Sequence, residues 1–327
     1  MGKRRRSVLE SHDNDYSALL ARAPGRLKSI SVVVPWFNAH RYRVSFAGAL
    51  AAQSDRDFEL ILVDDGSMMP LTADPMVWEA VARDVRLVRH AVNHGGAAAL
   101  NTGCLLASGE IVVMLDADMV APPNLVADLR RTLSTGDDVC AVGFRGTAEL
   151  QDDGSLSQSA LEDDWRVEIL PDENFEVLCA RLGVGRPESR TYRLLDESRE
   201  WRDFGHGRVI GYWDLPVMVV GHTVGVDRAL YLDSGGTPEW CRGWGIRDTA
   251  LGAGLILAGA KIVPQKSIVS TQIAHAPLAG SRRQQLAELR GNYHRYKNWL
   301  SRSVGSSSIR SRRTFGMQNG VLLVEIG

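Results

Sequence analysis

Long apolar runs and paired cysteines are both missing from this chain of 327 residues. No run approaches the roughly 18 apolar residues that a membrane-spanning helix needs, so we expect no transmembrane segment. The basic cluster at 3–6 is not followed by an apolar stretch, and we therefore expect no secretory signal. The four cysteines are Cys104, Cys140, Cys179 and Cys241, and they form no Cys-x-x-Cys pair. This spacing favours reduced thiols in a cytoplasmic protein, with a disulfide as the alternative.

The charge balance and several missing motifs narrow the function further. Charged residues make up 24% of the chain and the formal net charge is −1, so nothing calls for a nucleic acid partner. The sequence has no Gly-x-x-x-x-Gly-Lys-Ser/Thr phosphate loop, no Gly-x-Ser-x-Gly nucleophile turn and no His-Glu-x-x-His zinc helix. The hydrophobic fraction of 44% allows a large core, built as one α/β domain or as two joined lobes.

Apolar strands and helical segments alternate over the first half of the sequence. Short β-branched runs predict strands at 30–35, 58–63, 85–89, 111–115 and 139–144. Helical spacing predicts helices at 44–53, 77–83, 95–107 and 122–133. The alternation predicts an α/β fold with a mostly parallel, Rossmann-like sheet flanked by helices. The second half is less regular, with predicted helices at 161–169, 175–182, 248–258 and 284–300 and predicted strands at 217–226 and 261–264.

Polar residues follow several predicted strands, at the edge where such sheets bind ligands. They are Asn38, Asp64, Asp65, Asp116 and Asp118. The Asp116-Ala117-Asp118 turn comes directly after an apolar strand. Its two carboxylates suit Mg²⁺ or Mn²⁺, because these ions prefer oxygen ligands, and such a cation neutralises charge on a departing diphosphate. The alternative for this turn is a solvated surface loop.

Four motifs stand in order along the first half of the chain. They are Val33-Val34-Pro35-Trp36-Phe37-Asn38, Phe58-Glu59-Leu60-Ile61-Leu62-Val63-Asp64-Asp65-Gly66-Ser67, Asn93-His94-Gly95-Gly96-Ala97-Ala98-Ala99-Leu100-Asn101-Thr102-Gly103 and Asp116-Ala117-Asp118. Together they resemble the nucleotide-binding half of the GT-A glycosyltransferases, especially family 2 and its relatives. The resemblance implies a GT-A fold and a nucleotide-sugar donor, with a UDP-sugar as the first expectation.

The resemblance also implies a role for each matching residue on the donor side. Around the nucleobase and ribose it places Pro35, Phe37 and Asn38, with Asp65 (or Asp64) on the base edge or ribose. Bordering the nucleotide it places Asn93, Gly95 and Gly96, in a motif that also holds Asn101. Asp116 contacts the ribose or donor sugar, and Asp118, beyond Ala117, ligates the metal. The alternatives are a plain helix N-terminal turn at the two glycines and a satisfied polar residue inside a helix at Asn101.

A segment of the second half carries a further resemblance. Arg242-Gly243-Trp244-Gly245-Ile246-Arg247-Asp248 resembles the Gly-Trp-Gly-x-Glu-Asp segment of the subgroup that includes chondroitin-type polymerases and polypeptide N-acetylgalactosaminyltransferases. The resemblance places Gly243 and Trp244 on the acceptor side and makes Asp248 the catalytic base, which removes the proton of an acceptor hydroxyl. Arg247 replaces the subgroup's Glu, so it either pairs with Asp248 or holds an anionic acceptor group. The alternatives are a helix N-terminal acid at Asp248 and core packing at Trp244.

His275 lies just before a proline, where the same subgroup has a His metal ligand. The resemblance implies that His275 shares a Mn²⁺ or Mg²⁺ ion with Asp118, and the alternative is a structural histidine. The basic segment at 282–313 is either a solvated helix face or part of a lid, with Arg282 or Arg283 reaching the diphosphate.

These motifs predict a metal-dependent glycosyltransferase that moves a sugar from a nucleotide-sugar to an acceptor hydroxyl. Inversion with Asp248 as base is expected, and retention is the alternative. We expect an arm at 1–28, a donor half at 29–145, an acceptor half at 146–300, a flexible tail at 301–327, and a soluble acceptor such as a small metabolite, a peptide or a glycan. One rival is a nucleotidyltransferase, which would carry a glycine-rich loop with a basic residue after its first strand. The other is a non-catalytic nucleotide-sugar-binding protein, against which Asp118, Asp248 and His275 argue.

Overall fold

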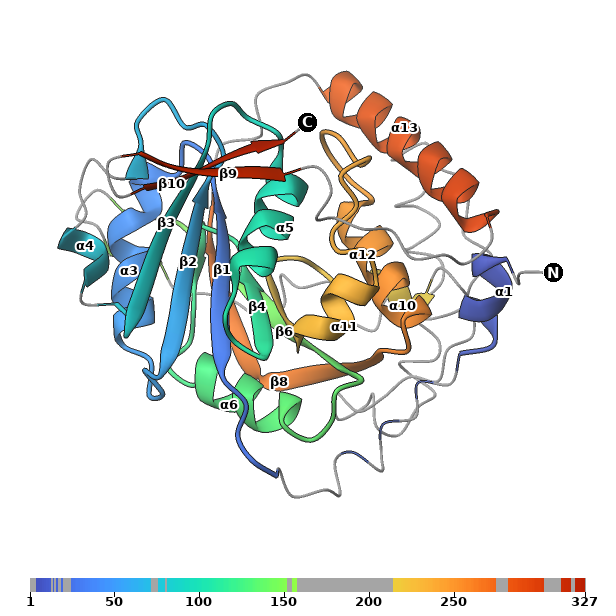
Figure 1. The fold of residues 1–327 in the computed structure, drawn as a ribbon, viewed down its shortest axis with the longest axis horizontal. Coiled ribbons are helices and arrows are strands. Elements are labelled where there is room, and N and C mark those ends of the chain that lie inside the picture. The colour runs from blue at the N-terminus through green and yellow to red at the C-terminus, as the bar shows by residue number, and fades with distance from the viewer. Residues whose placement is uncertain are drawn as a thin grey trace.

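The computed structural model (Figure 1) describes residues 4–12, 14, 16, 19, 25–71, 76–79, 81–151, 155–157, 214–274, 282–302, 313–318 and 321–326. Its centre is one sheet of ten strands in the order β5-β8-β6-β7-β4-β1-β2-β3-β10-β9. The strands are β1 (Ile30–Trp36), β2 (Phe58–Asp64), β3 (Asp84–His90), β4 (Ile111–Leu115), β5 (Met119–Val120), β6 (Val139–Ala148), β7 (Thr223–Asp227), β8 (Lys261–Ile273), β9 (Arg313–Gln318) and β10 (Val321–Ile326).

Helices cover both faces of this sheet (Figure 1). They are α1 (Arg5–Glu10), the 3-10 turn η1 (His40–Tyr42), α3 (Arg43–Ala51), α4 (Met76–Glu79), α5 (Gly96–Leu106), α6 (Leu125–Leu133), α10 (Asp214–Val217), α11 (Arg228–Asp233), α12 (Arg247–Leu257) and α13 (Arg282–Leu300). The α/β prediction with a mostly parallel sheet is confirmed. Among the helices described, none combines the length and apolar character needed to cross a bilayer.

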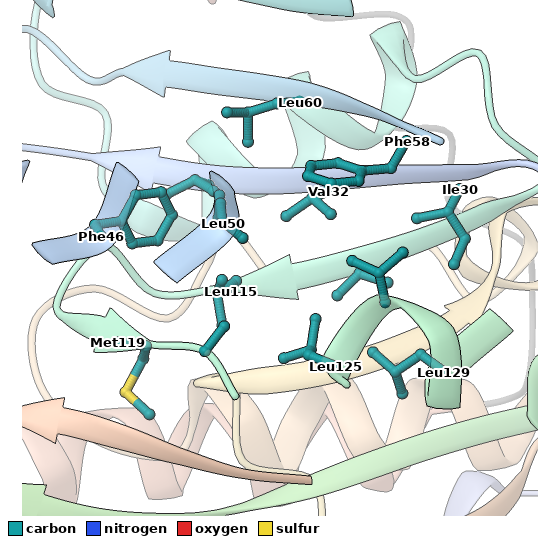
Figure 2. Packing of buried hydrophobic residues seen from close by; sticks show 14 of the residues in the cluster. Ile30, Val32, Phe46, Leu50, Phe58, Leu60, Leu115, Met119, Leu125 and Leu129 are labelled. Atoms are coloured by element: carbon teal, nitrogen blue, oxygen red, sulfur yellow. The ribbon is translucent and has the colours of Figure 1, made fainter. Parts of the chain in front are cut away.

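Successive side chains of the central strands β1, β2 and β4 point to opposite faces of the sheet. Both faces are covered, so the side chains on either face are buried. Val33 and Ile61 belong to the cluster on the face covered by α5 and α12, whereas Val32 and Leu60 belong to the opposite cluster. Figure 2 shows that second cluster, where side chains of α3 and α6 pack against the strands. A continuous apolar run therefore forms a strand at the centre of the molecule.

The parallel strands place their carboxyl ends at one edge. β1 pairs in parallel with β2 on one side and with β4 on the other. Their chain order reverses between β1 and β4, which is the topological switch point where α/β sheets bind ligands. The turns after β1, β2 and β4 carry the predicted polar residues to this edge.

The second half joins the same sheet. β7 runs antiparallel between β4 and β6, and β8 pairs in parallel with β6. The predicted strand at 217–226 is wrong in its first part. The short helix α10 ends at Val217, and the strand begins only at Thr223. The predicted strand at 261–264 continues to Ile273. The predicted helices at 161–169 and 175–182 lie outside the described residues.

The end of the chain differs from the flexible tail that we expected. β9 and β10 form an antiparallel hairpin, and β10 pairs in parallel with β3. The physical reason is the apolar sequence Val-Leu-Leu-Val of β10, which pairs with the otherwise open side of β3 and leaves β9 at the edge of the sheet. Figure 1 shows this hairpin, in red, beside β3.

Candidate active site

A cleft of about 1220 Å³ opens at the carboxyl ends of β1, β2 and β4. Both halves of the chain line it. Of the residues predicted from sequence, the lining includes Pro35, Phe37, Asn38, Asp65, Asn93, Gly95, Gly96, Asp116, Ala117, Asp118, Gly243, Trp244, Arg247 and Asp248. Residues separated by more than 200 positions in the chain therefore face one space.

Asp65 is buried directly after β2 and holds the loop that leads into α5. Its Oδ1 accepts from the backbone N–H of His94 at 2.9 Å, and its Oδ2 accepts from that of Gly95 at 2.7 Å. The Nδ1 of His90, at the end of β3, lies 2.6 Å from Oδ1. Burial opposes ionisation, but the hydrogen bonds from His90, His94 and Gly95 outweigh it, and the pKa of Asp65 lies below its ordinary value.

Asn38 turns the chain after β1 in a left-handed conformation, with φ of 50°. Asn tolerates this conformation better than most residues. Its backbone N–H donates to Ser67 Oγ at 2.9 Å, and its Oδ1 accepts from the N–H of Met68 at 3.0 Å. This turn leaves the neighbouring Phe37 ring 50% exposed at the cleft, where it can lie against a flat ligand.

Two residues predicted on the donor side lie outside the cleft lining. Asp64 is buried, accepts from the N–H groups of Ser67 at 2.8 Å and Leu71 at 3.3 Å, and pairs with Arg89. Its sequence neighbour Asp65 takes the cleft position because adjacent residues on an extended chain point in opposite directions.

Asn101 is buried within α5 and joins that helix to the second half of the chain. Its Oδ1 accepts from Tyr231 Oη at 2.7 Å and from the N–H of Thr237 at 2.8 Å. Its Nδ2 donates to Thr237 O at 2.8 Å and to Glu239 Oε1 at 2.7 Å. These contacts agree with the alternative expected for Asn101, a polar residue inside a helix whose hydrogen bonds are all made within the protein.

The Asp116-Ala117-Asp118 turn follows β4 and is tied to the end of β8. Asp118 O accepts from the N–H of Ile273 at 2.8 Å, and an Asp118 carboxylate oxygen accepts from Gln272 Nε2 at 2.9 Å. Withdrawal from water raises the pKa of Asp116 to about 7; Arg247 lowers it, and the nearby Asp118 and Asp248 raise it.

The N-terminus of α12 carries two oppositely charged residues, Arg247 and Asp248, which face the Asp116-Ala117-Asp118 turn. Ile246, with φ of 69°, is strained for a β-branched residue, and strain of this kind gathers at functional sites. Arg247 Nε donates to Asp248 Oδ1 at 2.9 Å, and these side chains are 29% and 31% exposed. The attraction of Asp248 is the main cause that raises the pKa of Arg247. A Cβ at Gly96 would lie 2.9 Å from Arg247 Nη1, so the guanidinium bridges α12 and the start of α5.

Side chains of helix α13 form hydrogen bonds with the backbone of the Gly243-Trp244-Gly245 loop. The buried Asn292 donates to the carbonyl oxygens of Arg242 and Gly245 at 2.9 and 3.1 Å, and Glu288 accepts from the N–H of Trp244 at 2.9 Å. Both glycines have positive φ, and a Cβ at either would lie within about 2.5 Å of Glu288 or Leu289. Trp244 is 37% exposed and lines the cleft.

Helix α13 contributes to the cleft lining, and residues 303–312 of the predicted lid lie outside the described residues. Gln284, Gln285 and Glu288 of α13 line the cleft, whereas Arg283 is exposed and absent from the described lining. Sequence reasoning missed the three lining residues, and also Arg41, Tyr42 and Gln272. Their positions carry no motif, because neighbours across a cleft leave no periodic signal in the sequence.

The carboxylates in this part of the cleft suit a divalent cation. Asp116 and Asp118 both line the cleft and offer the oxygen donors that Mg²⁺ and Mn²⁺ prefer. Within the described residues no three His, Cys, Asp or Glu side chains form a metal-binding group, so remaining ligands would come from a diphosphate or from other residues. The predicted ligand His275 lies outside the part of the chain that the structure describes.

The fold and cleft place this protein in the class of GT-A folds. The mannosyltransferase PcManGT from Pyrobaculum calidifontis, solved with GDP-Man and Mn²⁺, aligns with a TM-score of 0.53 and 18% identity over 89% of this chain and 70% of its own. GalNAc-T7, solved with UDP, GalNAc and Mn²⁺, aligns with a TM-score of 0.54 and 16% identity over 84% and 48%. At such identities these likenesses show the fold alone.

Sequence similarity is concentrated in the first half. Residues 31–170, less than half of the chain, match Glycosyl transferase family 2. Glycosyltransferase GlyG of Streptococcus pneumoniae is 34% identical over 116 residues, which are 35% of this chain and 38% of that protein. An undecaprenyl-phosphate 4-deoxy-4-formamido-L-arabinose transferase of Erwinia tasmaniensis is 35% identical over 118 residues, 35% of this chain and 36% of that protein. The chain thus matches little more than a third of the length of these relatives.

Proposed function

We propose that this chain is a metal-dependent glycosyltransferase that moves a sugar from a nucleotide-sugar, with a UDP-sugar preferred, to an acceptor hydroxyl. The observation that carries the proposal is the single cleft in which Asp65, the Asp116-Ala117-Asp118 turn and the Arg247–Asp248 pair come together. Named glycosyltransferases among the relatives support the reaction class. Structural neighbours solved with UDP-GlcNAc or GDP-Man support a nucleotide-sugar donor.

On the donor side, each group has a chemical role. Asp65 would accept hydrogen bonds from the base or ribose, and Phe37 would lie against the base. Gly95 and Gly96 would let the backbone approach the nucleotide closely. Asp118, with Asp116, would hold Mn²⁺ or Mg²⁺, which neutralises charge on the departing nucleoside diphosphate when bound. His275 remains a proposed ligand on the strength of its sequence position. Asp64 and Asn101 are left out of the proposed contacts because they face other partners.

On the acceptor side, Asp248 would act as the base. Arg247 engages Asp248 Oδ1, which fixes the carboxylate and leaves Oδ2 to take the proton of a hydroxyl as its oxygen attacks the anomeric carbon. A single attack from that side inverts the anomeric configuration. Trp244 and Gly243 would border the acceptor, which we propose to be a small metabolite, a peptide or a glycan.

The first experiment is a thermal-shift screen of UDP- and GDP-sugars with and without Mn²⁺. Ligands that bind only the folded chain raise its melting temperature, so a rise that needs both metal and nucleotide-sugar is expected. Release of nucleoside diphosphate from the selected donor then tests turnover. Binding without release, with any metal and an acceptor panel that includes undecaprenyl phosphate, would instead indicate a binding protein. NMR of the product's anomeric proton distinguishes inversion from retention.

A further inference from the structure

A chain of buried hydrogen bonds connects the C-terminal hairpin to Asp65 and has no place in the reaction described above. We propose that the β9–β10 hairpin positions Asp65 for nucleotide binding through Arg313, Thr102 and His90. The inference rests on the proposed function, since it concerns how that site's Asp65 is held. Arg313 and Thr102 are positioning residues, because neither lines the cleft.

The hairpin docks against the strand that ends in His90. β10 pairs with β3 in parallel, and Val324 stands opposite His90 in the register. The side chain of Arg313, the first residue of β9, is fully buried beneath the hairpin. Backbone pairing and a buried cation therefore both fix the hairpin beside His90.

The three side chains form a continuous line of hydrogen bonds. Arg313 Nε lies 2.9 Å from Thr102 Oγ1, and Thr102 Oγ1 lies 2.9 Å from His90 Nε2. His90 Nδ1 lies 2.6 Å from Asp65 Oδ1. His90 and Thr102 are both 0% exposed, so water does not compete for these contacts.

The donor and acceptor roles along the line are fixed at its two ends. A guanidinium only donates, so Thr102 Oγ1 accepts from Arg313, and in the proposed line its hydroxyl donates to His90 Nε2. An ionised carboxylate only accepts, so His90 Nδ1 must carry the ring proton and donate it to Asp65. Thr102 therefore selects the tautomer of His90 that can hold Asp65.

The selected tautomer has a consequence for the nucleotide loop. Asp65 Oδ1 also accepts from the N–H of His94, and its Oδ2 accepts from that of Gly95. Without the Thr102 hydroxyl, the buried Nε2 of His90 loses its hydrogen-bond donor, so the ring is held less firmly and its hydrogen bond to Asp65 weakens. The carboxylate and the loop that it anchors then lose their fixed orientation toward the cleft.

Two substitutions at one position separate this role from packing. Thr102→Val keeps the shape of the side chain and removes the hydroxyl, whereas Thr102→Ser keeps the hydroxyl and removes a methyl group. We expect Thr102→Val to weaken binding of UDP or GDP with Mn²⁺ by about three- to ten-fold, the effect of losing one hydrogen bond. Thr102→Ser should bind within about two-fold of the wild type. A packing role predicts the reverse order.

Glu239→Gln is the matched control, because Glu239 pairs with Arg313 on the side away from His90. It perturbs the same buried guanidinium but leaves the line to Asp65 intact, so its nucleotide affinity should equal that of the wild type. Isothermal titration calorimetry with UDP and GDP in Mn²⁺ measures all four proteins. Equal affinities for Thr102→Val and the wild type would overturn the inference alone, and a wild-type chain that binds neither nucleotide would overturn the proposed function as well.

A spectroscopic measurement on the wild type needs no variant to fold. Long-range ¹⁵N–¹H correlation spectra distinguish a histidine ring protonated at Nδ1 from one protonated at Nε2. We expect His90 to carry its proton on Nδ1 alone. A proton on Nε2, in a neutral or a cationic ring, would contradict the proposed line of hydrogen bonds whatever the binding data show.

Discussion

Replacing Asn292 by Leu tests how α13 holds the Gly243-Trp244-Gly245 loop. Asn292 is fully buried, and its Nδ2 lies 2.9, 3.2 and 3.1 Å from the carbonyl oxygens of Arg242, Trp244 and Gly245. An amide nitrogen has two protons, so these contacts amount to two hydrogen bonds. The N–H of Arg242 donates a third to Oδ1 at 3.3 Å. Arg295 Nη1 also donates to Oδ1 at 3.0 Å, but Arg295 is exposed and can bond to water instead, so the three bonds to the loop carry the expected loss.

The expected loss follows from these three bonds. At about 1 kcal/mol for each, Asn292→Leu should lower the free energy of unfolding by about 3 kcal/mol. Leu has the same number and branching of side-chain heavy atoms as Asn and is the larger residue, so the substitution leaves no cavity. A domain stable by about 5–15 kcal/mol would remain folded. Urea denaturation measures the change as a lower midpoint with an unchanged slope.

Asn298 on the same helix provides the control, because its side chain is exposed. Asn298→Leu makes the same chemical change at the surface and should alter the free energy of unfolding by less than about 0.5 kcal/mol. Equal losses in the two variants would refute the reasoning. In a working transfer assay, Asn292→Leu should raise the KM for the acceptor more than that for the donor, because the loop borders the proposed acceptor site.

Three further outcomes are expected. Asp248→Asn should lower kcat by on the order of 10²–10⁴-fold while leaving donor affinity in calorimetry nearly unchanged, because the amide cannot take the acceptor's proton. Asp118→Asn should weaken Mn²⁺-dependent binding of UDP and leave metal-independent binding unaltered, as measured by titration with and without Mn²⁺; equal loss in both conditions would contradict a metal role. The pKa of Asp65 is depressed in the folded chain, so its ionised form stabilises the fold above the unfolded value of about 3.9. The stability difference between the wild type and Asp65→Asn should therefore be constant from about pH 5 upward and shrink as the pH falls below about 4, as measured by urea denaturation across pH; a difference that persists at low pH would contradict this assignment.

Local sequence patterns sufficed for the secondary structure of residues 29–145. β-branched runs and helical spacing predicted β1, β2, β3, β4 and β6 within a few residues, because buried strands and amphipathic helices have distinct periods. Polar residues directly after those strands predicted the position of the cleft. Their order along the chain was enough to place most of the cleft residues that follow β1, β2 and β4, since parallel strands bring their carboxyl ends to one edge.

The C-terminal hairpin shows where local patterns were misleading. The Ser- and Gly-containing approach to it indicated a mobile tail, and its short apolar strand carried no signal of a partner. Only the free edge of β3, more than 200 residues earlier in the chain, gives that strand a place to pair. Pairing between distant strands depends on which edges remain open after the rest of the sheet forms.

The sequence by itself determined the α/β architecture, the edge of the sheet at which the cleft lies and the acidic turn at Asp116-Ala117-Asp118, because each depends on residues that are consecutive in the chain. Tertiary structure decided which of two adjacent acids faces the cleft, that Asn101 joins the two halves, and that Glu288 and Asn292 hold the Gly243-Trp244-Gly245 loop. It also brought Arg313 to Thr102 and thereby to Asp65. The physical reason is that a hydrogen bond between residues far apart in the chain depends on side-chain direction and packing, and neither has a period that the sequence can display.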